Sequence, residues 1–567
     1  MRAVVLTARF LFSANYLKVC YNKPYKTKTE DIMDYSQILS QQFNIKEEYA
    51  KNIITLLDDG NTIPFIARYR KEMHGSMDDQ LIREFAEKLE YLRGLDKRRD
   101  EIRSLIDAQE KLTDEINLAL DKAATLSELE DIYRPYRPKR KTRASIAKEK
   151  GLEPLANNIL KQEKGFDPSK SAVDYIDEEK GVTSVEDAIQ GAMDIIAELV
   201  SDNAEIRKRI RNLTNANGVL VSVATDEEKD SVYKNYYDYK EPVKKIAGHR
   251  VLAVNRGEKE GFLKVSVETD SEKPLNSIFR AMITDKNQLC SDIIREACTD
   301  AYQRLIYPSI EREVRNDLTD TASENAMKVF AVNLKQLLMQ PPVKGKTVLA
   351  LDPGYRTGCK TAVVDSTGKV LDTTVIYPTH SDKKIQESKQ TLLRLIKKHH
   401  VDIISIGNGT ASKETEMFTA ETIKEADHPV YYMVVSEAGA SVYSASKLAA
   451  TELPDLDLTL RSAVSIARRL QDPLAELVKI EPKAIGVGQY QHDMPQKKLG
   501  ETLDGVVEDC VNSVGADLNT ASPALLSRVS GLNATVCKNI VAYREENGAF
   551  SSSCLLYTSP SPRDPKT

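Results

Sequence analysis

The strongest positively charged feature of the sequence lies between Tyr133 and Arg143 and reads YRPYRPKRKTR. It contains no acidic residue, and its two prolines favour an extended backbone. Each arginine can form a two-pronged hydrogen bond with a phosphate group. We therefore predict that nucleic-acid phosphates are contacted by the basic residues of this run, Arg134, Arg137, Lys139, Arg140, Lys141 and Arg143. The alternatives are a solvated loop, or arginines paired with the acidic residues that precede them, Glu128, Glu130 and Asp131.

Two carboxylates, Asp352 and Glu437, follow strand-like segments at Val348–Leu351 and Val430–Val435. Such residues can hold the metal ions of a nuclease, but two-metal hydrolysis needs several converging acids. Asn408 ends a further strand-like segment, and Arg461 occupies the later helix where another acid would complete the set. A guanidinium there would repel metal ions. We therefore predict that this is a vestigial nuclease site that binds no metal. The alternative is that Asp352 is only a turn residue before Pro353-Gly354.

A third candidate site lies near the C-terminal end. Ser522-Pro523 predicts the cap and first residue of a helix that runs to Val529, and Asn533 predicts the cap of a second helix. Two short helices around a glycine hairpin form a helix–hairpin–helix unit, which binds phosphates through backbone N–H groups without reading sequence. The predicted contacts are Ser530, Gly531, Leu532 and Lys538. The alternative is a plain helical hairpin that packs domains together.

These sites require two kinds of scaffold. Residues 34–340 show the spacing of almost continuous helix, interrupted by β-like segments at Val219–Val223, Val251–Val254 and Phe262–Val267. After Pro341-Pro342 the pattern predicts three strands in succession and then alternating strands and helices, which is the order of a ribonuclease-H-like sheet. The expected fold class is therefore multidomain and mainly α, with one α/β ribonuclease-H-like domain.

Composition narrows the functional class. The 567 residues carry a net charge of −5, so nucleic-acid binding must use local patches. No apolar run reaches the roughly 18 residues of a membrane span. The seven cysteines include no C-x-x-C pair and the histidines no H-E-x-x-H motif, which predicts a reducing compartment, no metal and no cofactor. We expect a cytoplasmic protein without membrane contact.

Several long segments resemble one family, the bacterial transcription accessory protein Tex. They are TIPFIARYRKE from Thr62, the basic run, RLIYPSIERE from Arg304, LDPGYRTG from Leu351, EAGASVYS from Glu437 and GQYQHD from Gly488. The resemblance implies a helical N-terminal region with helix-turn-helix elements, a YqgF-type ribonuclease-H-like domain, paired helix–hairpin–helix motifs and a C-terminal OB-fold RNA-binding domain. The chain is expected to stop inside the second helix–hairpin–helix, before the OB-fold.

The resemblance also implies a function. The protein would be a scaffold for transcription that binds RNA or DNA, possesses a degenerate nuclease domain, and contacts the transcription machinery. Two other classes remain open, a metal-dependent nuclease of the resolvase type (if another acid such as Asp472 reaches the strand ends) and a purely protein-binding scaffold. The expected division of the chain is a spurious extension (1–32), a helical region (33–340) with a strand-containing insertion near 219–267, a YqgF-type domain (345–480), a helix–hairpin–helix region (481–550) and an artefactual tail (551–567).

Overall fold

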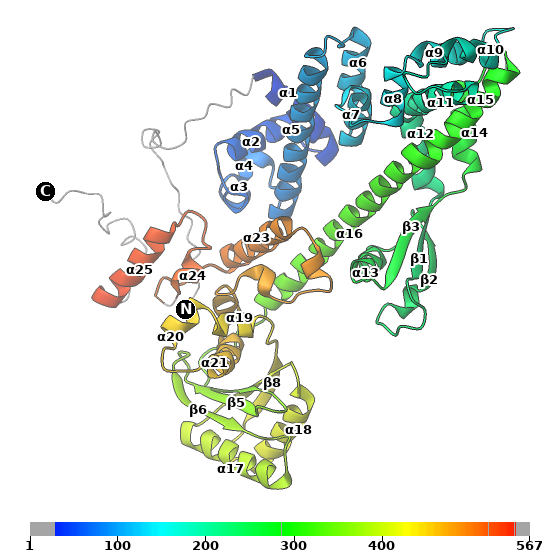
Figure 1. The fold of residues 1–567 in the computed structure, drawn as a ribbon. Coiled ribbons are helices and arrows are strands. Elements are labelled where there is room, and N and C mark those ends of the chain that lie inside the picture. The colour runs from blue at the N-terminus through cyan, green and yellow to red at the C-terminus, as the bar shows by residue number, and fades with distance from the viewer. Residues whose placement is uncertain (1–28, 285, 520, 549, 551–567) are drawn as a thin grey trace. The chain divides into compact units, whose positions relative to one another are not determined.

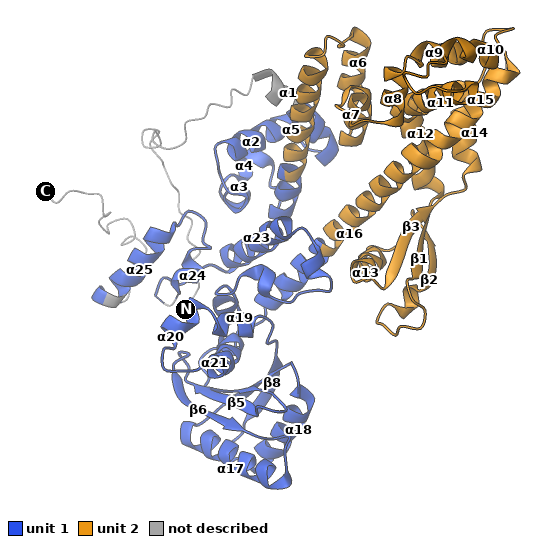
Figure 2. Cartoon of the chain, viewed as in Figure 1, with its two compact units in different colours: residues 1–86, 327–567 blue, residues 87–326 orange. Residues whose placement is uncertain are grey.

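The computed structural model describes residues 29–284, 286–519, 521–548 and 550, so the expectations for residues 1–28 and 551–567 lie outside the described residues. The contacts of the chain divide it into two compact units, residues 1–86 with 327–567, and residues 87–326 (Figure 2). The fold is mainly helical with one five-stranded mixed sheet, which confirms the predicted fold class. None of the described helices has the length and apolar character needed to cross a membrane.

The first unit begins with a group of helices before the chain enters the long helix α5 (Asp79–Asp107). Two glutamates in the first turn of α2 stabilise the helix by interacting with the positive end of its dipole, and the same helix buries Ile53 and Ile54. Pro64 lies in the first turn of α3, where a missing N–H costs no hydrogen bond. The helices of this group are α1 (Thr29–Phe43), α2 (Glu47–Asp58), α3 (Ile63–Tyr69) and α4 (Lys71–His74).

The sheet of the first unit has the strand order β6-β5-β4-β7-β8 (Figure 1). Strands β4, β5 and β6 pair antiparallel, whereas β7 and β8 run parallel to β4, so the predicted meander followed by parallel strands is confirmed. In the central strand, Ala350 pairs with Ala362 on one side and with Ser405 on the other. The strands are β4 (Val348–Asp352), β5 (Cys359–Val364), β6 (Val370–Ile376), β7 (Ile403–Gly407) and β8 (Tyr431–Val435).

Helices cover both faces of this sheet, and the alternation of side chains along β4 assigns one set of residues to each face. Leu349 and Leu351 pack with residues of α17 (Asp382–His399) and α18 (Ser412–Thr422). Val348 and Ala350 pack with residues of α21 (Leu458–Gln471) on the opposite face. Asp352 ends β4 and Asn408 directly follows the parallel neighbour β7, so both residues lie at the same edge of the sheet, outside the core that the helices cover.

Further helices complete the first unit. Asp472 caps α22 (Pro473–Leu477) by accepting a hydrogen bond from the N–H of Ala475 at 3.0 Å. The other elements after the sheet are α19 (Ala440–Ser444), α20 (Lys447–Glu452), α22 (Pro473–Leu477), α23 (Gln496–Val514), α24 (Pro523–Leu526) and α25 (Ala534–Asn547).

The largest apolar cluster of the second unit receives many buried side chains from α11 (Val185–Asp202) and α15 (Gln288–Asp300). Helix α15 continues through the π-helical turn Ala301–Ile306 into α16 (Tyr307–Leu338). Other helices of this unit are α6 (Asp114–Lys122), α7 (Leu126–Tyr133), α8 (Arg143–Glu149), α9 (Glu153–Lys161), α10 (Pro168–Ala172), α12 (Ala204–Asn217) and α14 (Glu272–Met282).

The predicted strand-containing insertion is a three-stranded antiparallel sheet of order β2-β1-β3, formed by β1 (Val219–Ala224), β2 (Asp238–Pro242) and β3 (Leu263–Glu268). One predicted strand is wrong, because Val251–Val254 lies inside the helix α13 (Gly248–Lys259). Val251 and Val254 are three residues apart and share a helix face, and α13 packs on β3. Burial against the sheet overrides the β preference of these side chains.

Helix α12 also carries a buried ion network. Arg207, of which only 1% of the side chain is exposed, pairs with Asp131 on α7 and lies 2.6 Å from Glu313 on α16. Arg211 lies 2.6 Å from Asp131 and 2.8 Å from Glu313. Two arginines and two carboxylates thus neutralise one another in the interior and tie three helices together.

Candidate nucleic-acid interface

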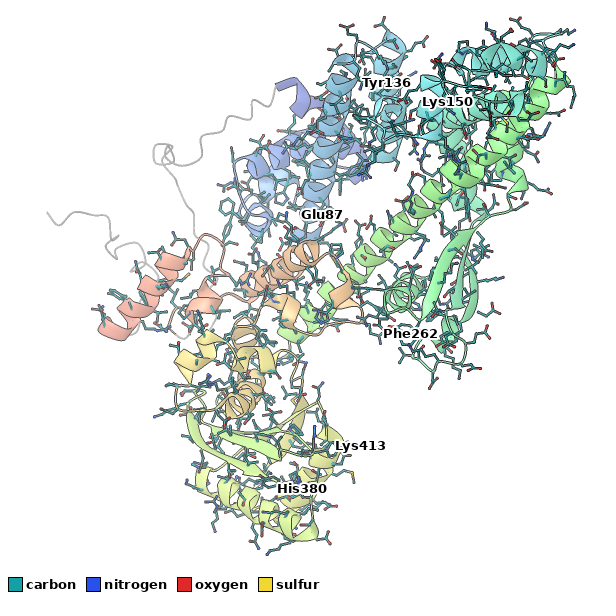
Figure 3. The ribbon with its side chains drawn as sticks, in the orientation of Figure 1. Glu87, Tyr136, Lys150, Phe262, His380 and Lys413 are labelled. Carbon is teal, nitrogen blue, oxygen red and sulfur yellow. The ribbon has the colours of Figure 1, made fainter. Side chains whose placement is uncertain are left out.

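The basic run connects α7 to α8, and Tyr136 and Lys150 mark this region in Figure 3. Arg134 begins a short 3-10 helix, Arg134–Tyr136, and the extended backbone predicted for the run starts only at Arg137, with φ −67° and ψ 134°. Thr142 then caps α8 by accepting a hydrogen bond from the N–H of Ser145 at 3.0 Å. Only residues 138–141 of the run therefore lie outside a helix or its cap.

Three cations of the run are paired within the protein. Arg134 Nε lies 3.5 Å from Asp202 Oδ1, and Lys139 pairs with Asp202 as well as with Glu198 on α11. Burial lowers the pKa of the Arg134 guanidinium. Arg137 Nη2 lies 3.3 Å from Glu130, yet 59% of the Arg137 side chain is exposed. Of these three cations, only Arg137 pairs with one of the acidic residues that precede the run. Arg134 and Lys139 pair with residues of α11 instead.

The other cations of the run face solvent. Arg140 and Lys141 are exposed, and neither has an ion-pair partner within the described part of the chain. Arg143 is exposed at the first residue of α8, where its charge acts on Asp194. Arg137, Arg140, Lys141 and Arg143 therefore form the charged surface that a ligand can reach, and we call these four residues the basic loop surface.

The helix–hairpin–helix segment has the predicted caps but a shorter first helix. Helix α24 ends at Leu526 and turns occupy residues 527–531, so the helix stops short of the expected Val529. Gly531 has φ +91°, a value that favours glycine. Asn533 caps α25 by accepting a hydrogen bond from the N–H of Val536 at 2.9 Å. No described atom lies within 4 Å of the position that a β-carbon would take at Gly531, so its environment is open.

The predicted backbone contacts of this hairpin are not equally available. The N–H of Ser530 donates to Asn512 Oδ1 at 2.9 Å, and the N–H of Leu532 donates to the Val529 carbonyl at 3.2 Å. The N–H of Gly531 has no such acceptor among the described residues. The first N–H groups of α25 also lack intrahelical partners, and Lys538 is exposed one turn further along. These groups make a small anion-attracting surface at Gly531 and the start of α25.

Asn512 supports this hairpin, although no sequence motif points to it. Besides accepting from Ser530, its amide donates to the carbonyls of Glu508 at 2.7 Å and Arg528 at 2.9 Å. It therefore fixes the hairpin to α23. A polar residue near the end of an amphipathic helix carries no local pattern that would reveal this long-range role.

The two candidate acids lie close enough at the strand ends for their charges to interact. Burial raises the pKa of Asp352, although a hydrogen bond with Ser462 and the charge of Lys360 act in the opposite direction. Burial also raises the pKa of Glu437, and the charge of Asp352 adds to this effect. Glu437 lies over the Gly407-Asn408-Gly409 turn, where its N–H donates to Asn408 Oδ1 at 3.1 Å.

The sequence predicted that Arg461 lies near these acids, but the nearby positive charges are Lys360 and Arg469. Arg461 turns away and donates from Nε to the Leu453 carbonyl at 3.1 Å. The helix face that meets the strand ends holds Ser462, Ile466 and Arg469, spaced four and three residues apart, and Arg461 lies one residue outside it. Arg469 is buried, donates to the carbonyls of Ser436 and Ala438, and its charge partly opposes the rise in the pKa of Glu437.

The residues at this edge do not fit a two-metal centre. Such a centre needs several carboxylates around the ions, and here Asp352 and Glu437 are accompanied by a neutral amide, a hydroxyl and two cations. Lys360 is buried and donates to the carbonyls of Thr357 at 3.0 Å and Gly358 at 3.1 Å, so its charge is held in place. Within the described ranges, no three His, Cys, Asp or Glu side chains converge as metal ligands.

Comparison with known proteins agrees with this architecture. Family models match four segments, namely a Tex-like protein N-terminal domain (33–107), a Tex central region (163–330), a Tex protein YqgF-like domain (346–471) and a helix-hairpin-helix motif (511–556). The transcriptional accessory protein Tex of Neisseria gonorrhoeae is 46% identical over 540 residues, which cover 93% of this chain and 70% of that protein. This chain belongs to the Tex family.

Other relatives extend the Tex family match. The YdcI protein of Bacillus subtilis is 49% identical over 527 residues, covering 92% of this chain and 73% of that protein. The human S1 RNA-binding domain-containing protein 1 is 39% identical over 546 residues, covering 93% of this chain and 54% of that protein. The Tex family YqgF-like match coincides with the five-stranded sheet, and the helix-hairpin-helix match contains the Gly531 turn.

Proposed function

We propose that this chain is a non-enzymatic nucleic-acid-binding scaffold that acts with the transcription machinery in the cytoplasm. Its ligand would be RNA or DNA, bound through phosphates and without sequence preference. The observation that carries the proposal is the hairpin at Gly531, where unpaired backbone N–H groups and Lys538 face solvent inside a segment that matches a helix-hairpin-helix motif. Groups of this kind position a protein on phosphates and carry no base-specific information.

The basic loop surface supports the same ligand. Arg140 and Lys141 have no competing carboxylate among the described residues, so a phosphate would meet charges that are still free. Arg137 would have to break its ion pair with Glu130 to bind a phosphate, so its net contribution to the binding free energy is smaller. We therefore expect the loop to bind mainly through Arg140 and Lys141.

The test is a salt titration of binding to labelled single-stranded RNA and duplex DNA. Each phosphate contact contributes about 0.9 to the slope of log affinity against log salt on a duplex and about 0.7 on a single strand. The double variant Arg140→Ala/Lys141→Ala should reduce that slope by about 1–2. The matched control is Lys111→Ala/Lys122→Ala, which removes two exposed lysines that have no ion pair within the described residues.

Equal slopes for the loop variant and the wild-type chain would remove the basic loop surface from the interface. Failure of the wild-type chain to bind either nucleic acid would reject the proposal and leave a protein-binding scaffold as the remaining function.

A nuclease of the resolvase type is the second candidate, because Asp352 and Glu437 lie close enough for their charges to interact. We propose that it is inactive, since Lys360 and Arg469 supply positive charge where metal ions would need carboxylates. Incubation of junctions, duplexes and RNA with Mg²⁺ or Mn²⁺ should give no cleavage above background. Cleavage that disappears in Asp352→Asn would establish the nuclease instead.

A further inference from the structure

A basic cavity lies between α12 and α14 in the second unit. The two helices pack against each other and leave a cavity of about 430 Å³. We call it the α12–α14 groove, and its lining residues are Arg209, Leu213, Lys273, Asn276, Ser277 and Arg280. It is separate in the sequence from both the basic loop surface and the helix–hairpin–helix segment.

The geometry of the two helices places the cations there. On α12, Ile206 and Ile210 enter the apolar core, and Arg209 and Leu213 lie four residues apart on another face. On α14, Pro274 and Ile278 are buried, whereas Lys273, Ser277 and Arg280 follow one another at helical spacing. The groove is thus walled by two regular helix faces rather than by loops.

The cations of the groove are unpaired, in contrast to their neighbours on the same helix. Arg207 and Arg211 are neutralised by Asp131 and Glu313, and Lys208 lies 2.8 Å from Glu128. Arg209 has no carboxylate partner within the described residues, and the same holds for Lys273 and Arg280. None of the described residues that line the groove is Asp or Glu. Three cations around one cavity repel one another, and a bound anion would relieve that repulsion.

The spacing of the cations indicates an extended anion. Lys273 and Arg280 are seven residues apart on α14, which corresponds to about 10 Å along the helix axis. One phosphate is too small to occupy both ends, whereas successive phosphates of a strand can. Between the ends, Asn276 and Ser277 offer hydrogen-bonding groups and Leu213 offers an apolar surface for a sugar or base. The groove is open on one side, and its volume of about 430 Å³ suits one nucleotide-sized group of a flexible strand, which can enter the groove where a rigid duplex cannot.

We propose that the α12–α14 groove binds the sugar-phosphate backbone of single-stranded nucleic acid as a second contact on this chain. The choice of nucleic acid over an acidic polypeptide rests on the proposed function. The groove itself rests on the unpaired cations and their spacing. In this arrangement a strand lies along α14, with phosphates at Lys273 and Arg280 and a further phosphate reached by Arg209.

The test uses the full chain and a fluorescein-labelled oligouridylate, whose anisotropy is measured across a KCl series. The groove variant is Arg209→Ala/Lys273→Ala/Arg280→Ala, and the control Lys111→Ala/Lys122→Ala/Lys164→Ala removes three other exposed lysines of the same unit that have no ion pair within the described residues. At about 0.7 per contact, the groove variant should lower the salt slope by about 2 and the affinity at 0.1 M salt by about tenfold to a hundredfold. The control should change both quantities much less.

Two further measurements identify the ligand and guard against misfolding. All three groove cations are exposed, so the groove variant should melt like the wild-type chain, and the charge-conserving variant Arg209→Lys/Arg280→Lys should retain most of the binding. Duplex of the same length should show no difference between the groove variant and the control.

The outcomes separate the two proposals. If the wild-type chain binds the strand and Arg140→Ala/Lys141→Ala weakens it, but the groove variant matches the control, the groove inference fails while the proposed function stands. If the wild-type chain binds no strand, the proposed function fails and the groove inference fails with it. If polyglutamate occupies the groove and displaces the strand at equal charge concentration, the groove is a site for acidic polypeptides and the inference is overturned.

Discussion

The ring of Phe330 on α16 lies directly against Gly488, so that a β-carbon at residue 488 would be 1.9 Å from Cε1 of the ring. Phe330 is 4% exposed, and the neighbouring Asn333 donates to the Val487 carbonyl at 2.8 Å. Gly488 is therefore required by close packing rather than by its backbone angle. This contact connects α16 to the loop that begins the GQYQHD segment.

Gly488→Ala should destabilise the first unit by about 1–3 kcal/mol, because a buried ring must move to admit the methyl group. The matched control is Gly486→Ala, two residues earlier, where no described atom lies within 4 Å of the β-carbon position. Urea unfolding of the two variants gives the comparison. Equal stability would mean that Phe330 is free to move away.

The pair Asp79 and Asp509 predicts a pH dependence of stability. Burial raises the pKa of Asp509 to about 7, with a further contribution from Asp79, while Arg83 and Arg68 act in the opposite direction. A carboxyl with a raised pKa in the folded state binds its proton more tightly there than in the unfolded chain. Its stabilising effect is complete below the ordinary pKa of about 4 and is lost as the pH rises through about 7.

Asp509→Asn should therefore gain stability relative to the wild-type chain between pH 5 and 8, by an amount on the order of 1–3 kcal/mol. Measuring the difference between the two proteins at each pH cancels the titration of other groups. Parallel stability curves would show that Asp509 titrates normally.

The hairpin glycine gives a third prediction. Gly531 has φ +91° with an open environment, so Gly531→Val introduces backbone strain but no clash. We expect a cost of about 1–2 kcal/mol, confined to the helix–hairpin–helix segment, and weaker binding of duplex DNA. Gly500→Val is the control, because Gly500 lies inside α23 without a positive φ and with no described atom near its β-carbon position. Normal melting and binding of Gly531→Val would reduce the hairpin to a connector.

The ion network of α12 gives a fourth prediction. Arg207→Met leaves the carboxylates of Asp131 and Glu313 short of one buried partner, and should cost about 3–5 kcal/mol. Lys208→Met, at the next residue, removes an exposed pair with Glu128 and should cost less than about 1 kcal/mol. Thermal unfolding distinguishes them. A small effect of Arg207→Met would show that Arg211 alone can neutralise both acids.

The sequence predicted the elements that have strong local patterns. The strand Val348–Leu351 is buried on both faces and reads as a continuous apolar run, and the caps Ser522, Asn533 and Asp472 have the residue types that helix starts require. The order of three antiparallel strands followed by parallel ones then identified the sheet. The Tex family resemblance rested on long segments and is confirmed by the comparisons.

What the sequence could not predict depends on contacts between distant residues. Ser462 rather than Arg461 faces Asp352, because the register of α21 against the sheet is set by tertiary packing. The partners of Arg134 and Lys139, Asp202 and Glu198, lie on α11, between 59 and 68 residues further along the chain. The nucleic-acid roles of the basic loop surface and the hairpin stay predictions until binding is measured.

The buried ion network also bears on how the second unit folds. Arg207 reaches partners 76 residues earlier and 106 residues later in the chain, so the network closes only after large loops have formed. Until both acids arrive, α12 would have to bury uncompensated charge, which disfavours any intermediate in which this helix docks without α7 and α16. The second unit should therefore acquire these three helices in one cooperative step, with the ion network acting as a check on correct assembly.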